Sequence, residues 1–485
     1  MSDPVTPSHP RHPLPLGSER IPALDLAFSM LREAWEGFDT ARPGQPPPSP
    51  STLSLLAEGL PEQGVGALAA LQEAEGLLDE SLAQSRPRFF GYVGSSGLEV
   101  GVLAEALSAA HDVNLASVAA AATMVEQQTL HWVGEFLGFG QTSGVVTSGG
   151  MVSNLTALAA ARERALPGSR RSGLDGRATL YVSEEAHSSV DRSAELLGIG
   201  SDAIRAISID GDRRMNVGEL QRQVEQDIAD GRVPVAVVGT AGTTLTGAVD
   251  PLRPIAEVCA AHGIWFHVDG AYGLPAAATR SAGQLFDGLA LADSATVDAH
   301  KWLYVPKACG ILLVRDPGAL RRAFGHDAAY MVDVDENPVE RTLEYSRPFR
   351  ALKLWAAFRA HGASAFRAAL EENLRLARLL ADLVRASANL ELVVEPQLST
   401  VPFRRLPSTG SVDQHEVNQH KFNQHNADIA RRMQQQGDAY VTSAVVDGKT
   451  VLRPCITNFR TSPEDIRVLI DIVQRTGAAL DAQST

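Results

Sequence analysis

From residue 86 onward, short apolar runs alternate with alanine- and leucine-rich stretches of helical length. The runs include GVVTSG, ATLYVS, VPVAVVGTAG, IWFHVDGAYG, SATVDAH and GILLVRD. Each has the length of one strand and is apolar almost throughout, which is typical of a strand buried on both faces of a sheet. Because strands separated by helices return through crossover connections, this rhythm predicts an α/β fold with a largely parallel sheet.

The pattern changes on either side of this region, and we expect three parts. Residues 1–85 form an N-terminal tail and helical segment, in which the Pro-, His- and Ser-rich residues 1–20 are disordered. Residues 86–375 form the large domain. Residues 376–485 form a small C-terminal α+β domain, in which LELVVEP, TVPFRRL and KTVLRPCITN are predicted strands.

The charge and composition exclude several partners. A net charge of −14 disfavours nucleic acid, and no apolar run approaches the ~18 residues that span a membrane. Cys259, Cys309 and Cys455 lack metal-ligand spacing, as do the histidines of SVDQHEVNQHKFNQHN, so no metal site is expected. The few, scattered cysteines and the absence of a secretory signal favour the cytoplasm.

Three segments carry residues suited to chemistry. In TSGGMVSNLTAL, Gly149 and Gly150 join a strand to a helix, where free N–H groups attract an anion, although many such turns bind nothing. In HVDGAYG, Asp269 ends a buried strand, either as a helix cap or as an anion facing a cationic ring nitrogen. In DAHKWLYVP, Lys301 has apolar neighbours that would lower its pKa, unless it snorkels to water.

Together these segments supply an anion cradle, a carboxylate and a nucleophilic amine within one α/β domain. Pyridoxal 5′-phosphate (PLP) needs these three parts, because its phosphate must be anchored, its ring nitrogen kept protonated and its aldehyde held by an amine. A dinucleotide-binding oxidoreductase would instead need G-x-G-x-x-G, which TSGGMVSN does not supply. The sequence therefore predicts PLP as the cofactor.

The chain resembles the group II PLP-dependent amino-acid decarboxylases, which include aromatic-L-amino-acid and glutamate decarboxylases. The resemblance runs from about residue 86 to the C-terminus and rests on motifs in the family's order: RPRFFGYVGSS, TSGGMVSNLTAL, EEAHSSVDRSAELLGIG, GTAGTTLTGAVDP, HVDGAYG and DSATVDAHKWLYVP. It implies the aspartate-aminotransferase-like fold, fold type I, and a homodimer with its active sites near the subunit boundary.

The resemblance also implies a role for each matching residue. Lys301 would hold PLP as an imine, Asp269 would pair with the ring nitrogen, and His187 and Ala271 would pack on opposite ring faces. Other residues would complete the cofactor site: Gly149, Gly150, Met151, Ser294 and His300 at the phosphate, and Thr244 and Asp250 at the polar edge of the ring.

The substrate side departs from the aromatic decarboxylases. Asn114 falls where they tend to carry an aromatic residue, and Val93 and Gly94, after Tyr92, are smaller than the usual residues. The pocket is therefore roomier or more polar; an aromatic L-amino acid is favoured, and a smaller or acidic one stays open. Arg453 has two possible roles: it orients the substrate or the active-site wall, or it forms a salt bridge at the domain interface.

The predicted reaction is decarboxylation of an L-amino acid to the amine and CO₂. The family's long loop, which in the animal aromatic enzymes carries a proton-donating tyrosine, is shorter here, and neither Tyr330 nor Tyr345 matches that tyrosine cleanly. An aldehyde synthase that uses O₂ therefore remains an alternative. Another PLP carbon–carbon lyase, a transaminase and a non-catalytic PLP-binding protein also remain open.

Overall fold

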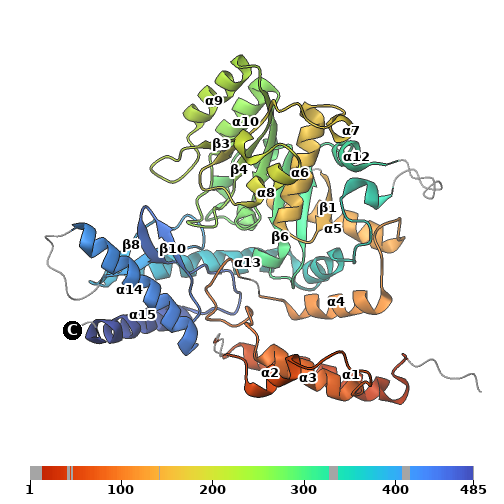
Figure 1. The fold of residues 1–485 in the computed structure, drawn as a ribbon, viewed down its shortest axis with the longest axis vertical. Coiled ribbons are helices and arrows are strands. Elements are labelled where there is room, and N and C mark those ends of the chain that lie inside the picture. Colours follow the sequence, from red (N-terminus) through yellow and green to blue (C-terminus); the bar gives the residue numbers. More distant parts are fainter. Residues whose placement is uncertain are drawn as a thin grey trace, which may run out of the picture.

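The computed structural model describes residues 14–40, 44, 47–94, 96–140, 142–326, 337–406 and 415–483, and only the backbone of 415–418. Its centre is a seven-stranded sheet of order β1-β7-β6-β5-β4-β2-β3 (Figure 1). The strands are β1 (Ser143–Thr147), β2 (Ala178–Ser183), β3 (Ile204–Ile207), β4 (Val233–Thr240), β5 (Trp265–Asp269), β6 (Ser294–Asp298) and β7 (Gly310–Val314).

Strand direction places many strand ends together. β2, β3, β4, β5 and β6 are parallel neighbours, whereas β7 is antiparallel to both β6 and β1. β1 therefore runs in the same direction as β6, and six of the seven strands end at one edge of the sheet. The prediction of a largely parallel sheet is confirmed, and the exception is the strand GILLV, whose apolar pattern does not reveal its direction.

Helices cover both faces of the sheet, as its apolar strands require. One face packs on α5 (Ala121–Leu137), α9 (Val217–Ala229), α10 (Leu252–His262) and the first part of α13 (Ala351–Ala386). The other face packs on α6 (Gly150–Ala165), α8 (Ser189–Leu196) and α12 (Ala319–Phe324). Neighbouring residues alternate between the two cores, so that Val146 belongs to the first and Val145 to the second.

A smaller antiparallel sheet forms the C-terminal part, in the order β10-β11-β9-β8. Its strands are β8 (Leu390–Leu392), β9 (Phe403–Arg405), β10 (Ser443–Val446) and β11 (Lys449–Leu452), and its helices are α14 (His415–Gln436) and α15 (Pro463–Gln483). α13 enters both cores, and the change occurs between Leu374 and Leu376. This supports a proposed domain boundary near residue 375, although the helix is continuous there.

The N-terminal helices α1 (Arg20–Phe38), α2 (Pro50–Leu56) and α3 (Ala67–Asp79) form a separate layer below α4 (Glu99–His111) in Figure 1. An ion pair of 3.3 Å between Asp39 and Arg460 links this layer to the body. Of the expected disordered tail, residues 1–13 lie outside the described residues, whereas residues 17–19 form a 3₁₀ turn that leads into α1. No described helix has both the length and the apolar character needed to cross a membrane.

Candidate active site

A cavity opens at the carboxyl edge of the large sheet. Its walls come from the loops after β1, β2, β4, β5 and β6, which is where α/β sheets place their ligands. The lining residues are Gly150, Met151, Asn154, His187, Ser189, Thr240, Gly242, Thr244, Asp269, Ala271, Tyr272, Asp298 and Lys301. The fold thus brings together seven of the residues predicted from the sequence.

One wall is the start of α6, which follows β1 directly. Gly149 is the N-cap, and no side chain caps the helix, so its first N–H groups remain available to an anion. A Cβ on Gly150 would lie 2.9 Å from the Cβ of Ala271 and 3.1 Å from Oδ2 of Asp298, so the close approach of these loops requires glycine. His300 borders this wall, because a Cβ on Gly149 would lie 3.5 Å from its ring.

Asp269, the last residue of β5, faces the cavity from the middle of the sheet. Its Oδ2 accepts a hydrogen bond of 2.9 Å from Nδ2 of Asn154, and its Oδ1 accepts one of 3.2 Å from the backbone N–H of Ala271. Only 6% of Asp269 is exposed. A carboxylate held at this point can accept the N–H of a protonated pyridine ring.

Lys301 lies on the single turn α11 (Ala299–Trp302), which begins where β6 ends. Its Nζ is 2.9 Å from Oδ2 of Asp298, the last residue of β6. This differs from the apolar surroundings expected from the sequence: Trp302 points away into the core, where its ring stacks on Tyr272, and the amine meets a carboxylate.

His187 follows β2 and also lines the cavity. Its Nδ1 lies 3.1 Å from the backbone N–H of Ser189 and accepts that proton, so a neutral ring carries its own proton on Nε2. Thr244, from the loop after β4, lines the same cavity. The structure therefore gathers His187, Thr244 and Lys301 around one space.

Asp250 lies behind this wall rather than in it. Its two oxygens each accept a backbone N–H at 2.7 Å, from Met215 and from Thr240, and burial raises its pKa to about 6. Thr240 ends β4 and lines the cavity, so Asp250 contributes by fixing that strand end.

The expectation for Ser294 is not met. It begins β6, four residues before Asp298 and therefore about 13 Å from the cavity edge. Its hydroxyl bonds Nε1 of Trp265 and Nδ1 of His267, both at 2.8 Å. A serine at this position cannot contact a phosphate held at the start of α6.

The predicted substrate residues lie outside the lining of this cavity. Tyr92 is 49% exposed, and its hydroxyl is 3.3 Å from that of Tyr440. Val93 packs against the large core, and Asn114 lies on the surface, where it accepts the N–H of Arg347. Arg453 reaches the rim, because its guanidinium donates to the carbonyl of Thr244 at 2.8 Å. Among the described residues Arg453 makes hydrogen bonds, not the salt bridge considered above.

Sequence reasoning missed Asn154 and Asp298. Asn154 holds Asp269 from one turn inside α6, and Asp298 pairs with Lys301. Their position beside two recognised motifs, TSGGMVSN and DAHKW, was the available signal.

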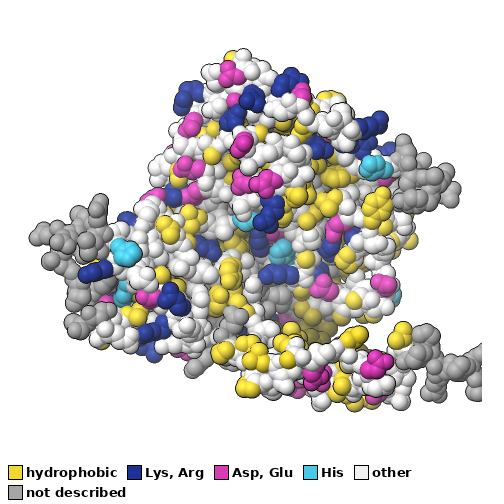
Figure 2. Space-filling model, viewed as in Figure 1, with side chains coloured by type: hydrophobic (Ala, Val, Ile, Leu, Met, Phe, Trp, Pro, Cys, Tyr) yellow, Lys and Arg dark blue, Asp and Glu magenta, His cyan; other side chains and the backbone are white. Residues whose placement is uncertain are grey.

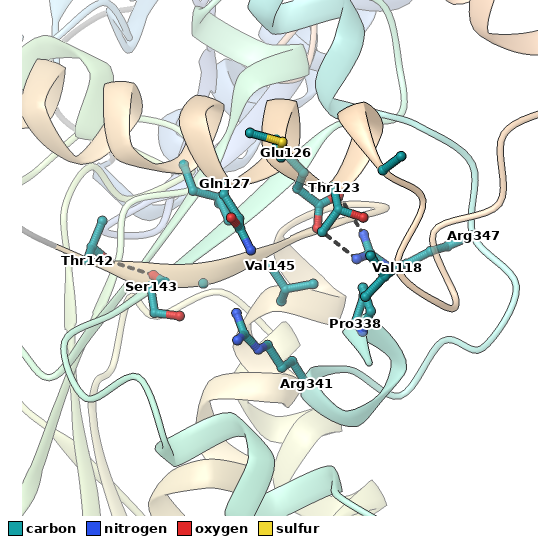
Figure 3. A pocket seen from close by; sticks show the side chains of 14 residues that line it. Val118, Thr123, Glu126, Gln127, Thr142, Ser143, Val145, Pro338, Arg341 and Arg347 are labelled. Atoms are coloured by element: carbon teal, nitrogen blue, oxygen red, sulfur yellow. Dashed lines mark hydrogen bonds and ion pairs between the residues drawn. The ribbon is translucent and has the colours of Figure 1, made fainter. Parts of the chain in front are cut away.

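A second cavity lies between α5 and the edge strand β1 (Figure 3). Its polar centre is the buried ion pair of Glu126 and Arg347, whose atoms lie 2.7 Å apart. The residues that line it include neither Lys301 nor Asp269, so it is not the candidate active site.

The residues of the first cavity fit PLP. Oγ1 of Thr240 and Oδ1 of Asp298 are buried and have no hydrogen-bond partner among the described residues, so both atoms are available to bind a ligand. The open end of α6 suits the phosphate, Asp269 suits the ring nitrogen, and Lys301 supplies the amine. Fold and site together define a PLP-dependent enzyme of fold type I.

Comparison with known proteins gives the family. The model of the pyridoxal-dependent decarboxylase conserved domain matches residues 50–406, and the chain belongs to this family of PLP-dependent amino-acid decarboxylases. It is 32% identical to the aromatic-L-amino-acid decarboxylase of Bacillus atrophaeus over 85% of each chain. It is also 32% identical to the cysteine sulfinic acid decarboxylase of Mus musculus, over 73% of this chain and 74% of that one.

A solved structure shows the same likeness. The 4-hydroxyphenylacetaldehyde synthase of Rhodiola rosea superimposes with a TM-score of 0.84 at 26% identity, over 96% of this chain and 99% of that one. The predicted fold, cofactor and carboxy-lyase class are confirmed. PLP supplies an electron sink for the pair released when the substrate's carboxylate leaves. Both Asp269 and His187 line this cavity; Asp269 would hold the proton on the ring nitrogen, and His187 would face the ring.

Proposed function

We propose that this enzyme decarboxylates an aromatic L-amino acid to the corresponding amine and CO₂. The observation that carries the substrate class is an aromatic cluster formed by Phe89, Tyr92 and Tyr440, outside the lining of the cavity. Phe89 and Tyr440 stack with centroids 4.9 Å apart, and Tyr92 lies 6.0 Å from Tyr440 with half of its surface exposed. Phe89 and Tyr440 are buried, so Tyr92 is the ring of this cluster that offers an exposed stacking surface to an aromatic side chain.

Residues of the small domain connect this aromatic cluster to the wall of the cavity. Tyr440 lies two residues before Thr442, whose carbonyl accepts the backbone N–H of Arg453, and the Arg453 guanidinium binds the carbonyl of Thr244 in the cavity wall. Arg453 also places one buried cation near the rim, which suits the α-carboxylate of any amino acid. An acidic side chain would need a further cation.

A substrate panel tests the proposal. The holoenzyme is assayed for CO₂ and amine with tyrosine, tryptophan, phenylalanine, aspartate, glutamate and cysteine sulfinate. We expect kcat/KM for the best aromatic substrate to exceed that for every acidic one by about tenfold or more, the effect of ~1.4 kcal/mol of differential binding. A higher kcat/KM with an acidic amino acid would contradict the proposed substrate class while leaving the decarboxylase chemistry intact.

The aldehyde synthase stands as the second candidate. It is favoured by the likeness to the Rhodiola rosea enzyme and by the position of Tyr345. Tyr345 is 51% exposed, outside the lining of the cavity, and Tyr330 lies outside the described residues. Assays with and without O₂ separate the two reactions, because peroxide and aldehyde formed in step with CO₂ identify the synthase.

We also propose that the enzyme is a homodimer. Helix α1 exposes Ile21, Leu24 and Phe28 along one face, at the i, i+3, i+7 spacing of an apolar stripe, and Figure 2 shows hydrophobic side chains across this layer. Asn114 lies on the surface, outside the active-site cavity of its own subunit, so it can contact a substrate only in the active site of a second subunit. The three free, buried cysteines support the cytoplasm as the compartment.

A further inference from the structure

A chain of buried side chains runs under the floor of the active site and ends on Asp269. Trp265 Nε1 lies 2.8 Å from Ser294 Oγ, which lies 2.8 Å from Nδ1 of His267. Nε2 of His267 lies 3.0 Å from Oδ1 of Asn154, whose Nδ2 lies 2.9 Å from Oδ2 of Asp269. Each of the first four residues is at most 1% exposed, so these contacts are buried from bulk solvent.

Hydrogen-bond chemistry gives this chain one direction. The Asn154 amide nitrogen donates to Asp269 and to Ser189 Oγ, so its Oδ1 is an acceptor and Nε2 of His267 must carry a proton. In a neutral imidazole Nδ1 is then unprotonated and accepts the Ser294 hydroxyl proton. Ser294 in turn accepts the indole N–H of Trp265, which can only donate.

The neutral state of His267 follows from its surroundings. Burial lowers its pKa to about 4, more than the nearby charge of Asp269 raises it. The ring is therefore uncharged at neutral pH, with its tautomer set by Ser294 and Asn154. A charged ring would lose the acceptor that Ser294 needs.

The end of the chain determines how Asp269 is held. Asn154 takes one lone pair of Oδ2, and the backbone N–H of Ala271 takes one of Oδ1, from the side of the cavity wall. These two donors fix the plane of the carboxylate and leave its remaining lone pairs for the cavity. Rotation of Asp269 would break both bonds.

We propose that Asn154 and His267 are positioning residues for the decarboxylation: they hold Asp269 in the orientation that keeps the proton on the ring nitrogen of PLP. His267 acts only through Asn154, since it lies outside the residues that line the cavity. The proposal rests on the PLP chemistry of the family and not on the proposed aromatic substrate. Ser294, expected at the phosphate, acquires a different role at the start of this chain.

The test compares five variants as PLP-loaded holoenzymes. His267→Phe keeps a ring but removes the hydrogen bonds to Ser294, Asn154 and Thr296, and Asn154→Leu removes the donor to Asp269. His267→Gln restores an N–H near Nε2. Thr156→Val is the matched control, because Thr156 is fully buried on the same helix and bonds only the carbonyl of Val152. Asp269→Ala gives the signal of a ring without its carboxylate.

The main readout is the ¹⁵N resonance of PLP labelled at the ring nitrogen, measured without substrate, which reports ring protonation directly. We expect His267→Phe and Asn154→Leu to move it toward the Asp269→Ala position, whereas His267→Gln and Thr156→Val stay near wild type. With the best amino-acid substrate, kcat should fall about 10–100-fold in the first two variants, as for other residues that orient a reacting group, with KM within about threefold.

The outcomes are distinguishable. If His267→Phe and Asn154→Leu both keep the wild-type resonance and kcat within twofold, the chain only fills the core and the proposal is wrong. If His267→Phe does not fold, Asn154→Leu with its circular dichroism melting curve decides the question alone. Failure of wild type to bind labelled PLP would instead reject the family function, and a preference for acidic substrates would leave this proposal untouched.

Discussion

At the scale of single residues, the cavity holds two buried carboxylates with different partners. Asp269 is held by N–H donors from Asn154 and Ala271. Asp298 pairs with the amine of Lys301 and keeps one oxygen without a partner among the described residues. Because Asp269 lies at the end of the central strand β5 and Asp298 lies beside the lysine, we propose that the first serves the ring nitrogen and the second the amine.

Asp269→Ala should reduce kcat far more than it weakens PLP binding. Removing the carboxylate removes the group that stabilises the positive ring nitrogen in the transition state, whereas the phosphate and imine contacts still hold the cofactor. We expect kcat to fall at least about 100-fold, comparable to the loss of one strong electrostatic contact. The measurement is single-turnover kinetics of the fully loaded variant; a rate within a few-fold of wild type would show that another group serves the ring.

Residues next to strand ends were predictable, and residues that act through tertiary contacts were not. Asp269 and Lys301 each end or follow a strand within a recognisable motif, and both line the cavity. Asn154 contributes because α6 packs against β5. This packing brings it to Asp269, which lies 115 positions later in the sequence. Ser294 was misplaced because the motif DSATVDAHKW does not show that Ser294 and Asp298 lie at opposite ends of β6.

At the scale of elements, the approach of α6 to the loops after β5 and β6 shapes the cavity wall at which we expect the phosphate of PLP. The glycine pair that predicted this turn also explains its tightness, since Gly150 faces Ala271 and Asp298. Most strand positions followed from apolar patterns, whereas β3, β10 and the direction of β7 did not. Strand direction depends on pairing partners, which no local pattern specifies.

Gly150→Ala should weaken PLP binding while leaving the fold intact. The new methyl group would lie 2.9 Å from Cβ of Ala271, and overpacking of this kind costs ~1–3 kcal/mol. Relief of this contact would move the start of α6, where the phosphate is expected to bind. We expect the dissociation constant for PLP to rise about tenfold, measured by cofactor fluorescence. Gly37→Ala is the control, because no atom lies within 4 Å of a Cβ there, and it should bind PLP like wild type. Equal affinity in the two variants would show that the wall has room.

At the scale of the whole molecule, the N-terminal layer and the surface around the second cavity both leave apolar side chains exposed. Met124 and Val118, which line that cavity, are 70% and 49% exposed. Apolar surface of this extent favours burial against a second copy, since two-fold dimers are the commonest closed assemblies. The predicted contact between Asn114 and substrate depends on this assembly. The sequence of one chain does not show which of its residues face a second copy.

Sedimentation should give a species of twice the 51.6 kDa chain mass. Phe28→Glu places a charge on the exposed stripe of α1 and should weaken the dimer by tenfold or more in dissociation constant, at about 1.4 kcal/mol per decade. Leu291→Glu is the matched control, with 50% exposure in the large domain compared with 49% for Phe28. A wild-type monomer with full activity at working concentrations would contradict the proposed homodimer.

The central claim is that Lys301 holds PLP in the cavity at the carboxyl edge of the sheet. The most direct measurement is reduction of the holoenzyme with borohydride, followed by digestion and mass spectrometry of the labelled peptide. The account predicts loss of the visible imine band and a phosphopyridoxyl group on Lys301 alone, with no label in Lys301→Ala. A label on another lysine, or a protein that takes up no PLP, would contradict it.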